Sequence, residues 1–508
     1  MVHTKQPSTF LCIGLAVFFG CLLPRLCMLG TFPYMDEGHY IYHAQSIWQC
    51  LTHTGSLPQT GSLNLYSLVL APLTGLSGNI FVPVRLADAL FAAVFGVLFV
   101  SLLIRECGRV VPGALVGALA LLCLNATDIA QAGAKNSFFL AYIPLIIALT
   151  RVLYAQRTGR SFFLAGMMTA LGVLLREPFA IYSVIGVVGC LCAFGLRAAL
   201  LYAAGGILAG SALISVLALL RHSFLQLVTT YANSVTIFAA EAGRVTHNAL
   251  HYGLSFCLHF WPLLLVFLLS LVLLAQKGDR KLLGRALFWG ALILAPFVEI
   301  LTKISFLYHY SMTIVGLAGL MSVSLRLACQ QYRKGEKLLC AVLACAFLLT
   351  VPGNIAFSAV PMTVRTLMSP PSHLWDPRDE AASNPLQAGG IIRSHKGSLT
   401  VSGFLYLLYP ICKKLPPDIH MEDLSRVYLL KKKDAREVRA YLLKNPPDLI
   451  ALGTTNETDH VAMFTEELTR IVQETGQYAL LATVPLDASK NYGWIGCDIY
   501  QRIPNTRQ

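Results

Sequence analysis

The sequence predicts a polytopic α-helical membrane protein with a soluble α/β domain at its C-terminal end. Three observations support this fold class. The 508 residues are 56% hydrophobic and only 13% charged, whereas soluble domains carry about 25% charged residues. About eleven apolar stretches have nearly the length of a bilayer span. From residue 361 onward the chain becomes more polar, and short apolar runs alternate with amphipathic ones.

Each apolar stretch has roughly the 17–25 residues of a transmembrane helix, or slightly fewer. The predicted spans lie near 10–30, 86–104, 111–127, 137–154, 161–175, 178–196, 198–220, 253–275, 284–302, 306–326 and 338–359. The first span contains Arg25 and lacks a small-residue cleavage site, so we interpret it as a retained helix rather than a signal peptide. The apolar stretch 64–80 is interpreted as re-entrant or interfacial because of the charge pattern.

Basic residues set the predicted orientation, since cytoplasmic loops are enriched in Lys and Arg. The basic clusters occur at 105–109, 151–160, 197, 277–285 and 326–337. They all fall on one side of the membrane if the N-terminus is cytoplasmic and 64–80 does not cross. This predicts a transmembrane domain over 1–360, whose first outer loop spans 31–85. It also predicts an extracytoplasmic domain over 361–508.

The tail after residue 361 begins with a proline-rich linker and continues with alternating strand and helix signals. The predicted elements are a strand over Arg426–Leu430, a helix capped by Asp434 that ends at Lys444, a strand over Asp448–Leu452, a helix over 459–475 closed by Gly476, and a strand over Tyr478–Pro485. Such alternation predicts a small α/β domain with a partly parallel sheet. The domain has no glycine-rich phosphate loop, so nucleotide binding is not indicated.

Composition also narrows the partners. The formal net charge is +13, but the basic residues are scattered among apolar spans, which does not fit nucleic-acid binding. A basic excess suits anionic membrane lipids. The 14 cysteines show no metal-ligand spacing. Cys412 and Cys497 lie in the tail and would form a disulfide only if the tail is outside the cytosol; the sequence leaves this open.

The acidic pair Asp36–Glu37 lies just after the first span and is the strongest functional signal. Ionisable groups next to hydrocarbon are costly and indicate a functional site. A carboxylate there can act as a general base toward an acceptor at the membrane face. The alternative is that both acids simply complement the dipole of a helix over residues 37–54. We favour catalysis by Asp36, with Glu37 orienting substrate or tuning the pKa of its neighbour.

The spacing of Asp36, His39, Tyr40 and His43 places these side chains on one face of a helix. An Asp and two His on one face could ligate a divalent metal. The competing interpretation is an interfacial helix whose polar side contains histidines. The sequence shows no further ligand nearby, so we predict no certain cofactor and keep the metal site of Asp36, His39 and His43 as the less favoured alternative.

Cations at the outer ends of the spans are candidates for binding a phosphate. Arg85, Lys135 and Arg176 occupy such positions, where a guanidinium or ammonium can hold a phosphate oxygen or extend to lipid headgroups. The phosphate role is favoured for Arg176, whereas both roles stay open for Arg85 and Lys135. His309 and Tyr310, at the start of the tenth span, are further candidates for contact with a phosphate or sugar.

Taken together, these motifs resemble the GT-C superfamily of membrane glycosyltransferases, in particular the group of the lipid A aminoarabinose transferase and protein O-mannosyltransferases. The resemblance covers roughly residues 10–330. It rests on the acidic motif Asp36-Glu37-Gly38-His39-Tyr40, with weaker matches listed here: Asn64-Leu65-Tyr66-Ser67, Arg85-Leu86, Arg176-Glu177-Pro178 and His309-Tyr310-Ser311-Met312. In one respect the chain departs from the group, because Ala134-Lys135-Asn136 stands where a second acid of the second outer loop is often found.

This resemblance implies a GT-C glycosyltransferase that takes a sugar from a polyprenyl-phosphate donor. The acceptor would be a lipid, glycan or protein at the outer face of the inner membrane. Asp36 would act as base, and Tyr66 and His39 would join the cations in substrate binding. Two alternatives remain: a transporter or flippase of lipid-linked glycans, and an inactive homologue that acts as a scaffold.

Overall fold

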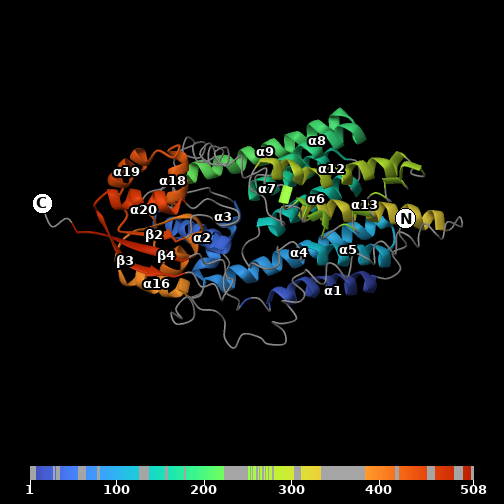
Figure 1. Ribbon diagram of the computed structural model, residues 1–508. Helices are drawn as coiled ribbons and strands as arrows, with labels where there is room; N and C mark the ends of the chain where they lie inside the picture. The colour runs from blue at the N-terminus through green and yellow to red at the C-terminus, as the bar shows by residue number, and fades with distance from the viewer. Residues whose placement is uncertain are drawn as a thin grey trace.

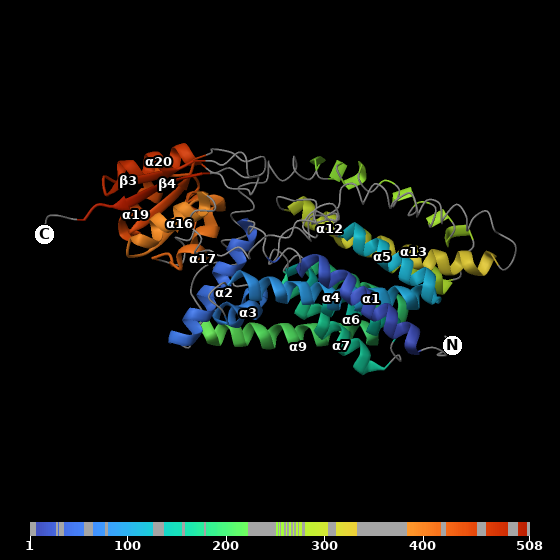
Figure 2. The ribbon, with the colours of Figure 1, turned by 90° about the horizontal axis from the view of Figure 1, so that it is seen from below.

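The computed structural model describes residues 7–26, 29, 35–54, 65–76, 80–124, 137–154, 158–176, 179–221, parts of 250–276, 280–302, 311–332, 384–417, 423–454, 464–485 and 496–504. Within these residues a long helical bundle lies beside a smaller unit that contains the β-sheet (Figure 1). The view from below shows that the sheet unit projects from one end of the bundle (Figure 2).

The bundle helices follow the predicted apolar spans. They are α1 (Pro7–Leu26), α4 (Phe81–Cys107), α5 (Val110–Leu124), α6 (Ser137–Tyr154), α7 (Gly159–Leu175), α8 (Ala180–Phe194), α9 (Leu196–Arg221), α12 (Arg280–Thr302) and α13 (Ser311–Tyr332). Three of the described helices, within α1, α4 and α9, are long and apolar enough to cross a membrane. The predicted span 253–275 is described only in part, and 338–359 lies outside the described residues.

Two elements of the first outer loop lie at the same end of the bundle as the C-terminal unit (Figures 1 and 2). They are α2 (Met35–Thr54) and a short pair formed by α3 (Leu65–Leu70) and the 3₁₀ helix η1 (Ala71–Gly75). At about 1.5 Å per residue, the short pair spans little more than half of a bilayer core of about 30 Å. The chain also leaves α1 and enters α4 at one end, because Arg85 Nη1 donates to the Leu29 carbonyl at 2.8 Å. The short length of this pair agrees with the non-crossing placement of 64–80, which stays a prediction.

The C-terminal unit is built around four strands in the order β1-β2-β4-β3. Their bounds are β1 (Leu399–Val401), β2 (Leu449–Gly453), β3 (Tyr478–Val484) and β4 (Cys497–Arg502). β1 runs parallel to β2, and the pairs β2–β4 and β3–β4 are antiparallel. The remaining elements are α16 (Asn384–Ser394), η6 (Gly403–Leu407), α17 (Leu408–Cys412), α18 (Leu424–Leu430), α19 (Ala435–Lys444) and α20 (Thr465–Glu474).

Strand alternation divides the core of this unit into two layers. Leu449 and Ala451 of β2 belong to a cluster that continues into the bundle, whereas Ile450 and Leu452 pack with residues of α18, α19 and α20. Successive strand residues point to opposite faces of a sheet, so the face bearing Leu449 is the one turned toward the bundle. The sheet thereby shares one apolar core with α2 and the transmembrane helices.

The structure corrects one predicted element. Residues predicted as a strand over Arg426–Leu430 form helix α18, which begins after Asp423. The Asp423 side chain accepts a hydrogen bond from the Ser425 amide at 2.9 Å, which satisfies an otherwise unpaired donor of the first turn. A short apolar run does not reveal by itself whether it is helical or extended. Strands β1 and β4 were not predicted, whereas Asp434 does cap α19 as expected.

The proposed disulfide is not present. Cys412 and Cys497 are free thiols, and both are buried. The Cys412 thiol donates to the Gly389 carbonyl at 3.6 Å, and burial raises its pKa to about 12. A thiol with a raised pKa is a poor nucleophile near neutral pH, so both residues act as apolar packing groups in this structure.

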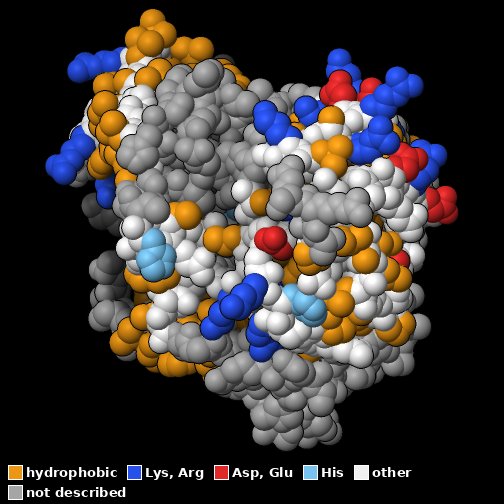
Figure 3. Space-filling view, turned by 90° about the vertical axis from the view of Figure 1, so that its left-hand side faces the viewer, with side chains coloured by type: hydrophobic (Ala, Val, Ile, Leu, Met, Phe, Trp, Pro, Cys, Tyr) orange, Lys and Arg blue, Asp and Glu red, His pale blue; other side chains and the backbone are white. Residues whose placement is uncertain are grey.

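Charged side chains are distributed unevenly over the surface. Figure 3 views the end of the molecule at which the C-terminal unit lies, and acidic and basic side chains gather there on one part of the face. The bundle helices instead expose apolar side chains, including Ile207, Leu219 and Leu287. Exposed apolar side chains along the bundle are expected of helices that contact lipid.

Gly38 makes the contact between α2 and the C-terminal unit testable. A Cβ atom at Gly38 would lie 2.6 Å from the Leu407 Cα, a backbone atom that cannot rotate away. We expect Gly38→Ala to lower the unfolding free energy by about 1–3 kcal/mol, as overpacking does. The measurement is the thermal unfolding midpoint of the purified protein.

Gly14→Ala is the matched control, because a Cβ at Gly14 of α1 meets nothing within 4 Å. Alanine there should be neutral or stabilise by about 0.5–1 kcal/mol. A Gly38→Ala protein as stable as the wild type would show that the two units are not packed against each other in this way.

Candidate active site at the end of the bundle beside the C-terminal unit

The acidic pair lies in the first turn of α2. The backbone places Asp36 directly before Glu37 in this helix, and the side chain of Asp36 lies outside the described part of the chain. Glu37 is fully buried, with 0% of its surface exposed. Of the two acids, Glu37 is therefore the one whose side-chain contacts the structure describes.

Glu37 forms a two-point ion pair with Arg85 of α4. Arg85 Nε donates to Glu37 Oε1 at 2.6 Å, and Arg85 Nη2 donates to Oε2 at 2.8 Å. The third arm of the guanidinium donates to the Leu29 carbonyl after α1. A buried charge pair is tolerated when all its donors and acceptors are used. One interaction thus joins α1, α2 and α4.

This ion pair changes the interpretation of Arg85. Its side chain is only 4% exposed, so it does not extend to lipid headgroups. Its guanidinium donates to Glu37 and to the Leu29 carbonyl. The structure accordingly gives Glu37 and Arg85 a shared role in fixing the start of α2.

Two further buried charges, Arg25 and Asp88, lie next to this pair. Asp88 follows Arg85 by three residues in α4, hence on the same helical face, and is 2% exposed. Arg25 and Glu37 are close enough to act on it electrostatically. Asp88 Oδ1 has no hydrogen-bond partner within the described residues. Sequence reasoning missed Asp88, although an acid inside an apolar span is itself a signal.

A row of aromatic rings extends from Arg25 toward Arg176. Arg25 lies over the Phe139 ring, at 4.7 Å from its centroid, and Phe139 contacts Tyr142. Tyr142 stacks on Phe179 at 5.4 Å between centroids, and the Arg176 guanidinium carbon is 5.9 Å from the Phe179 centroid. The Tyr142 hydroxyl also hydrogen-bonds to Ser311 of α13. The row connects the outer ends of α1, α6 and α7.

Arg176 terminates α7 and is 7% exposed. A guanidinium kept from bulk water in this way interacts strongly with an anion, because the local dielectric constant is low. Burial and position therefore suit the predicted phosphate contact better than extension to the membrane surface. The adjacent Glu177 lies outside the described residues, as do Lys135, His309 and Tyr310.

His39, Tyr40 and His43 contribute an aromatic layer on α2. The His39 ring is 4.3 Å from that of His43 and 4.5 Å from that of Tyr406. Tyr40 packs edge-on against Tyr66 of α3 at 5.3 Å. Tyr66 is fully buried and supports Tyr40. Burial, the neighbouring His43 and the positive charge of Arg426 hold the pKa of His39 well below its usual range.

The described residues contain no group of three His, Cys, Asp or Glu side chains that could hold a metal ion. His39 and His43 do lie together, but the third predicted ligand, the Asp36 side chain, is not described. Because the pKa of His39 is lowered, its ring is neutral at physiological pH and compatible with either a ligand role or simple packing.

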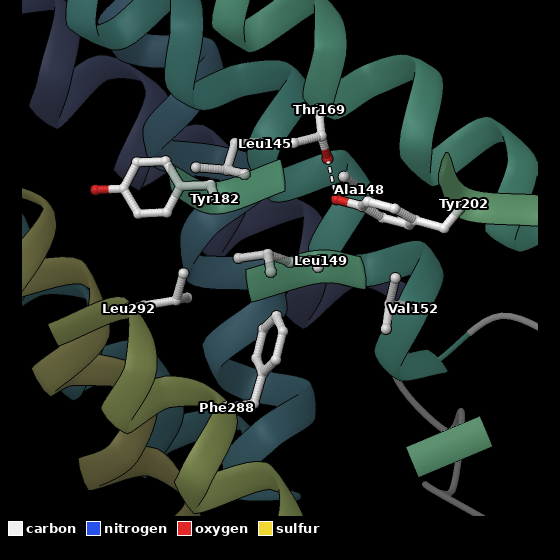
Figure 4. A pocket seen from close by; sticks show the side chains of 10 residues that line it. Leu145, Ala148, Leu149, Val152, Thr169, Tyr182, Tyr202, Phe288 and Leu292 are labelled. Atoms are coloured by element: carbon white, nitrogen blue, oxygen red, sulfur yellow. Dashed lines mark hydrogen bonds between the residues drawn. The ribbon is translucent and has the colours of Figure 1, made fainter. Parts of the chain in front are cut away.

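A separate small cavity lies deep in the bundle, between α6, α7, α8, α9 and α12 (Figure 4). Its lining is apolar except for hydroxyl groups, of which Thr169 and Tyr202 are hydrogen-bonded at 2.6 Å. The lining contains no carboxylate, imidazole or cation. The cavity therefore lacks the groups for acid–base chemistry, which gather instead around Glu37.

The Glu37–Arg85 pair can be tested by breaking it from one side. Arg85→Met leaves a buried carboxylate without its partner, which should cost about 3–5 kcal/mol of stability. Replacing both residues, as Glu37→Leu with Arg85→Met, should recover much of that loss because no charge stays buried. The measurement is the thermal midpoint of the single and double variants in the same detergent.

The control is Arg470→Met, which removes the exposed partner of Glu474 on α20. Such a surface pair contributes about 0–1 kcal/mol, so the midpoint should barely move. Equal losses in Arg85→Met and Arg470→Met would contradict a buried ion pair that fixes α2.

Comparisons with known proteins find solved structures with a similar fold. A scan of protein-family models and a search of curated proteins both find no match. The structure of ArnT from Cupriavidus metallidurans bound to undecaprenyl phosphate is similar, with 13% sequence identity, 99% coverage of both chains and a TM-score of 0.54.

The oligosaccharyltransferase of Archaeoglobus fulgidus, tethered to an acceptor peptide, is also similar. It has 11% identity and a TM-score of 0.50, over 87% of this chain and 69% of the other. At such low identity the similarity concerns the fold. The predicted resemblance is confirmed at that level: the chain is a membrane protein with a fold like that of the GT-C glycosyltransferases.

Proposed function

We propose that the chain is a glycosyltransferase that moves a sugar from a polyprenyl-phosphate donor to an acceptor. The reaction would take place at the outer face of the membrane, between the first outer loop and the C-terminal unit. The observation that carries the proposal is the fixed start of α2. The buried Glu37–Arg85 pair locks this turn at the outer end of the bundle, and Asp36 immediately precedes Glu37 on the same helix.

In this proposal Asp36 acts as general base. The acceptor transfers its proton to the Asp36 carboxylate while the acceptor atom forms a bond with the anomeric carbon of the sugar. The bond between that carbon and the phosphate oxygen breaks, and polyprenyl phosphate leaves with the electron pair. Glu37 is not assigned as the base, because both its oxygens accept hydrogen bonds from Arg85. In this proposal Glu37 positions Asp36. This is a more specific form of the supporting role that the sequence predicts for Glu37.

Arg176 is the proposed phosphate-binding residue. It is buried, positively charged and located where α7 ends beside the aromatic row of Phe179 and Tyr142. A planar guanidinium can hold two phosphate oxygens at once. The ArnT structure was determined with undecaprenyl phosphate bound, which supports a lipid phosphate as the donor class.

The distribution of charge disfavours the transporter alternative. Transporters bind substrate near the midplane, at interrupted helices. In the described residues the charges of Glu37, Arg85 and Asp88 lie near the outer end of α4 instead. A scaffold would have the same fold and contacts as an enzyme but no turnover. Only a measurement of activity therefore distinguishes these two alternatives.

The decisive experiment is Asp36→Asn. Loss of a positioned general base typically slows a reaction by about 10²–10⁴-fold, whereas Asn caps a helix nearly as well as Asp. We expect the purified variant to lose transfer from a polyprenyl-phosphate sugar by that factor and to keep the thermal midpoint of the wild type. A capping role predicts near-normal turnover instead, and that outcome would remove the base assignment.

The proposal also places residues 361–508 outside the cytosol of a cell with the protein in its inner membrane. A reporter enzyme fused after Gln508 that works only when exported should be active, because the basic clusters fall on the opposite side. Activity solely of a cytoplasmic reporter at the same position would reverse the orientation and relocate the site.

A further inference from the structure

The C-terminal unit brings a cation close to the helix that carries the proposed base. The Tyr406 ring packs edge-on against His39 at 4.5 Å between centroids. The guanidinium carbon of Arg426 lies 5.5 Å from the Tyr406 centroid. His39 follows Asp36 by three residues in α2, so both occupy one helical face. The Tyr406 ring therefore links Arg426 to the face of α2 that bears His39 and, one turn earlier, Asp36.

Buried neighbours hold Arg426 in this position. Asp423 is 4% exposed and accepts hydrogen bonds from the Tyr406 hydroxyl at 2.7 Å and the Ser425 amide at 2.9 Å. Arg426 Nε lies 3.7 Å from the same carboxylate. A cation that is ordered before binding loses less conformational entropy when a ligand arrives.

Exposure distinguishes Arg426 from the buried arginines of the bundle. Its side chain is 38% exposed, whereas Arg25, Arg85 and Arg176 are all below 9%. Its charge nevertheless reaches the site, because it helps to lower the pKa of His39. Arg426 is thus both accessible to a water-borne group and electrostatically coupled to α2.

We propose that Arg426 recognises an anionic group on the acceptor and so selects acceptors that carry a phosphate or carboxylate near the atom that receives the sugar. The inference rests on the proposed function, since it takes Asp36 as the base. An anionic acceptor approaching the carboxylate of Asp36 is repelled unless a cation offsets that repulsion. Arg85 is buried against Glu37, whereas Arg426, although paired with Asp423, is 38% exposed and carries a planar fork that suits phosphate and carboxylate oxygens.

The test measures binding of two amphiphiles that differ by a single phosphate. Octyl β-glucoside and octyl β-glucoside 6-phosphate are titrated against the full-length protein in lipid nanodiscs. Hydrogen bonds to charged groups contribute about 1.5–3 kcal/mol, so the wild type should bind the phosphorylated probe roughly tenfold more tightly or better. Arg426→Gln should reduce this ratio to about one, and Arg426→Lys should restore only part of it.

Arg439→Gln is the matched control. Arg439 lies on α19 of the same unit, is similarly exposed at 43%, and pairs with the exposed Glu474. Its loss should leave the phosphate preference intact. The thermal midpoint is recorded for all variants, and the Lys variant keeps the test open if the Gln variant is unstable. A wild type without phosphate preference, or a preference that survives in Arg426→Gln or falls equally in Arg439→Gln, overturns the proposal.

This readout fails independently of the proposed function, because binding is measured without turnover. If Asp36→Asn abolishes transfer but Arg426→Gln keeps the phosphate preference, the glycosyltransferase proposal stands and acceptor recognition by Arg426 is wrong. If Asp36→Asn turns over normally while the preference depends on Arg426, the anion site stands and the base assignment is wrong.

Discussion

The buried ion pair between Glu37 and Arg85 is the interaction on which the rest of the site depends. It joins the end of α1, the start of α2 and the outer end of α4 through three hydrogen bonds from one guanidinium. A desolvated pair of this kind is costly to break from either side. The ion pair therefore keeps the first turn of α2 from shifting along the bundle. The backbone of Asp36, the residue before Glu37, is held in place with that turn.

Helix α2 also connects the bundle to the C-terminal unit. Glu37 pairs with Arg85 of the bundle. On the side of the C-terminal unit, Tyr42 stacks on Tyr409 at 4.3 Å, and Gly38 lies so close to the Leu407 backbone that no side chain would fit. The absence of a side chain at Gly38 therefore has a packing explanation one residue away from the ion pair. Because both contacts involve α2, a displacement of the C-terminal unit would act on the turn that contains Asp36.

Much of the architecture was predictable, because apolar length and basic loops are strong one-dimensional signals. Asp434 as a helix cap was also readable, whereas the non-crossing placement of 64–80 stays a prediction. Pairings were not readable: nothing in spacing links Glu37 to Arg85, 48 residues later, or His39 to Tyr406 of the tail. The sequence therefore presents Arg85 as one of several equivalent cations, whereas the structure pairs it with Glu37 in a buried site. The roles of Lys135, His309 and Tyr310 remain predictions.

The charged residues near the start of α2 fall into two groups: a buried cluster that fixes this helix, and two arginines that are proposed to bind ligands. Among the described residues, the carboxylates of Glu37 and Asp88 match the guanidiniums of Arg25 and Arg85 in number, and all four side chains are buried. A phosphate that entered this cluster would compete with Glu37 for Arg85. Two further cations lie at the edges of this cluster: Arg176, beside the aromatic row, and Arg426, which is paired with Asp423 on the C-terminal unit. In the proposed reaction the sugar leaves a membrane-borne phosphate and joins a water-borne acceptor. Arg176, proposed to bind the phosphate, and Arg426, proposed to bind the acceptor, come from the two units that meet at α2.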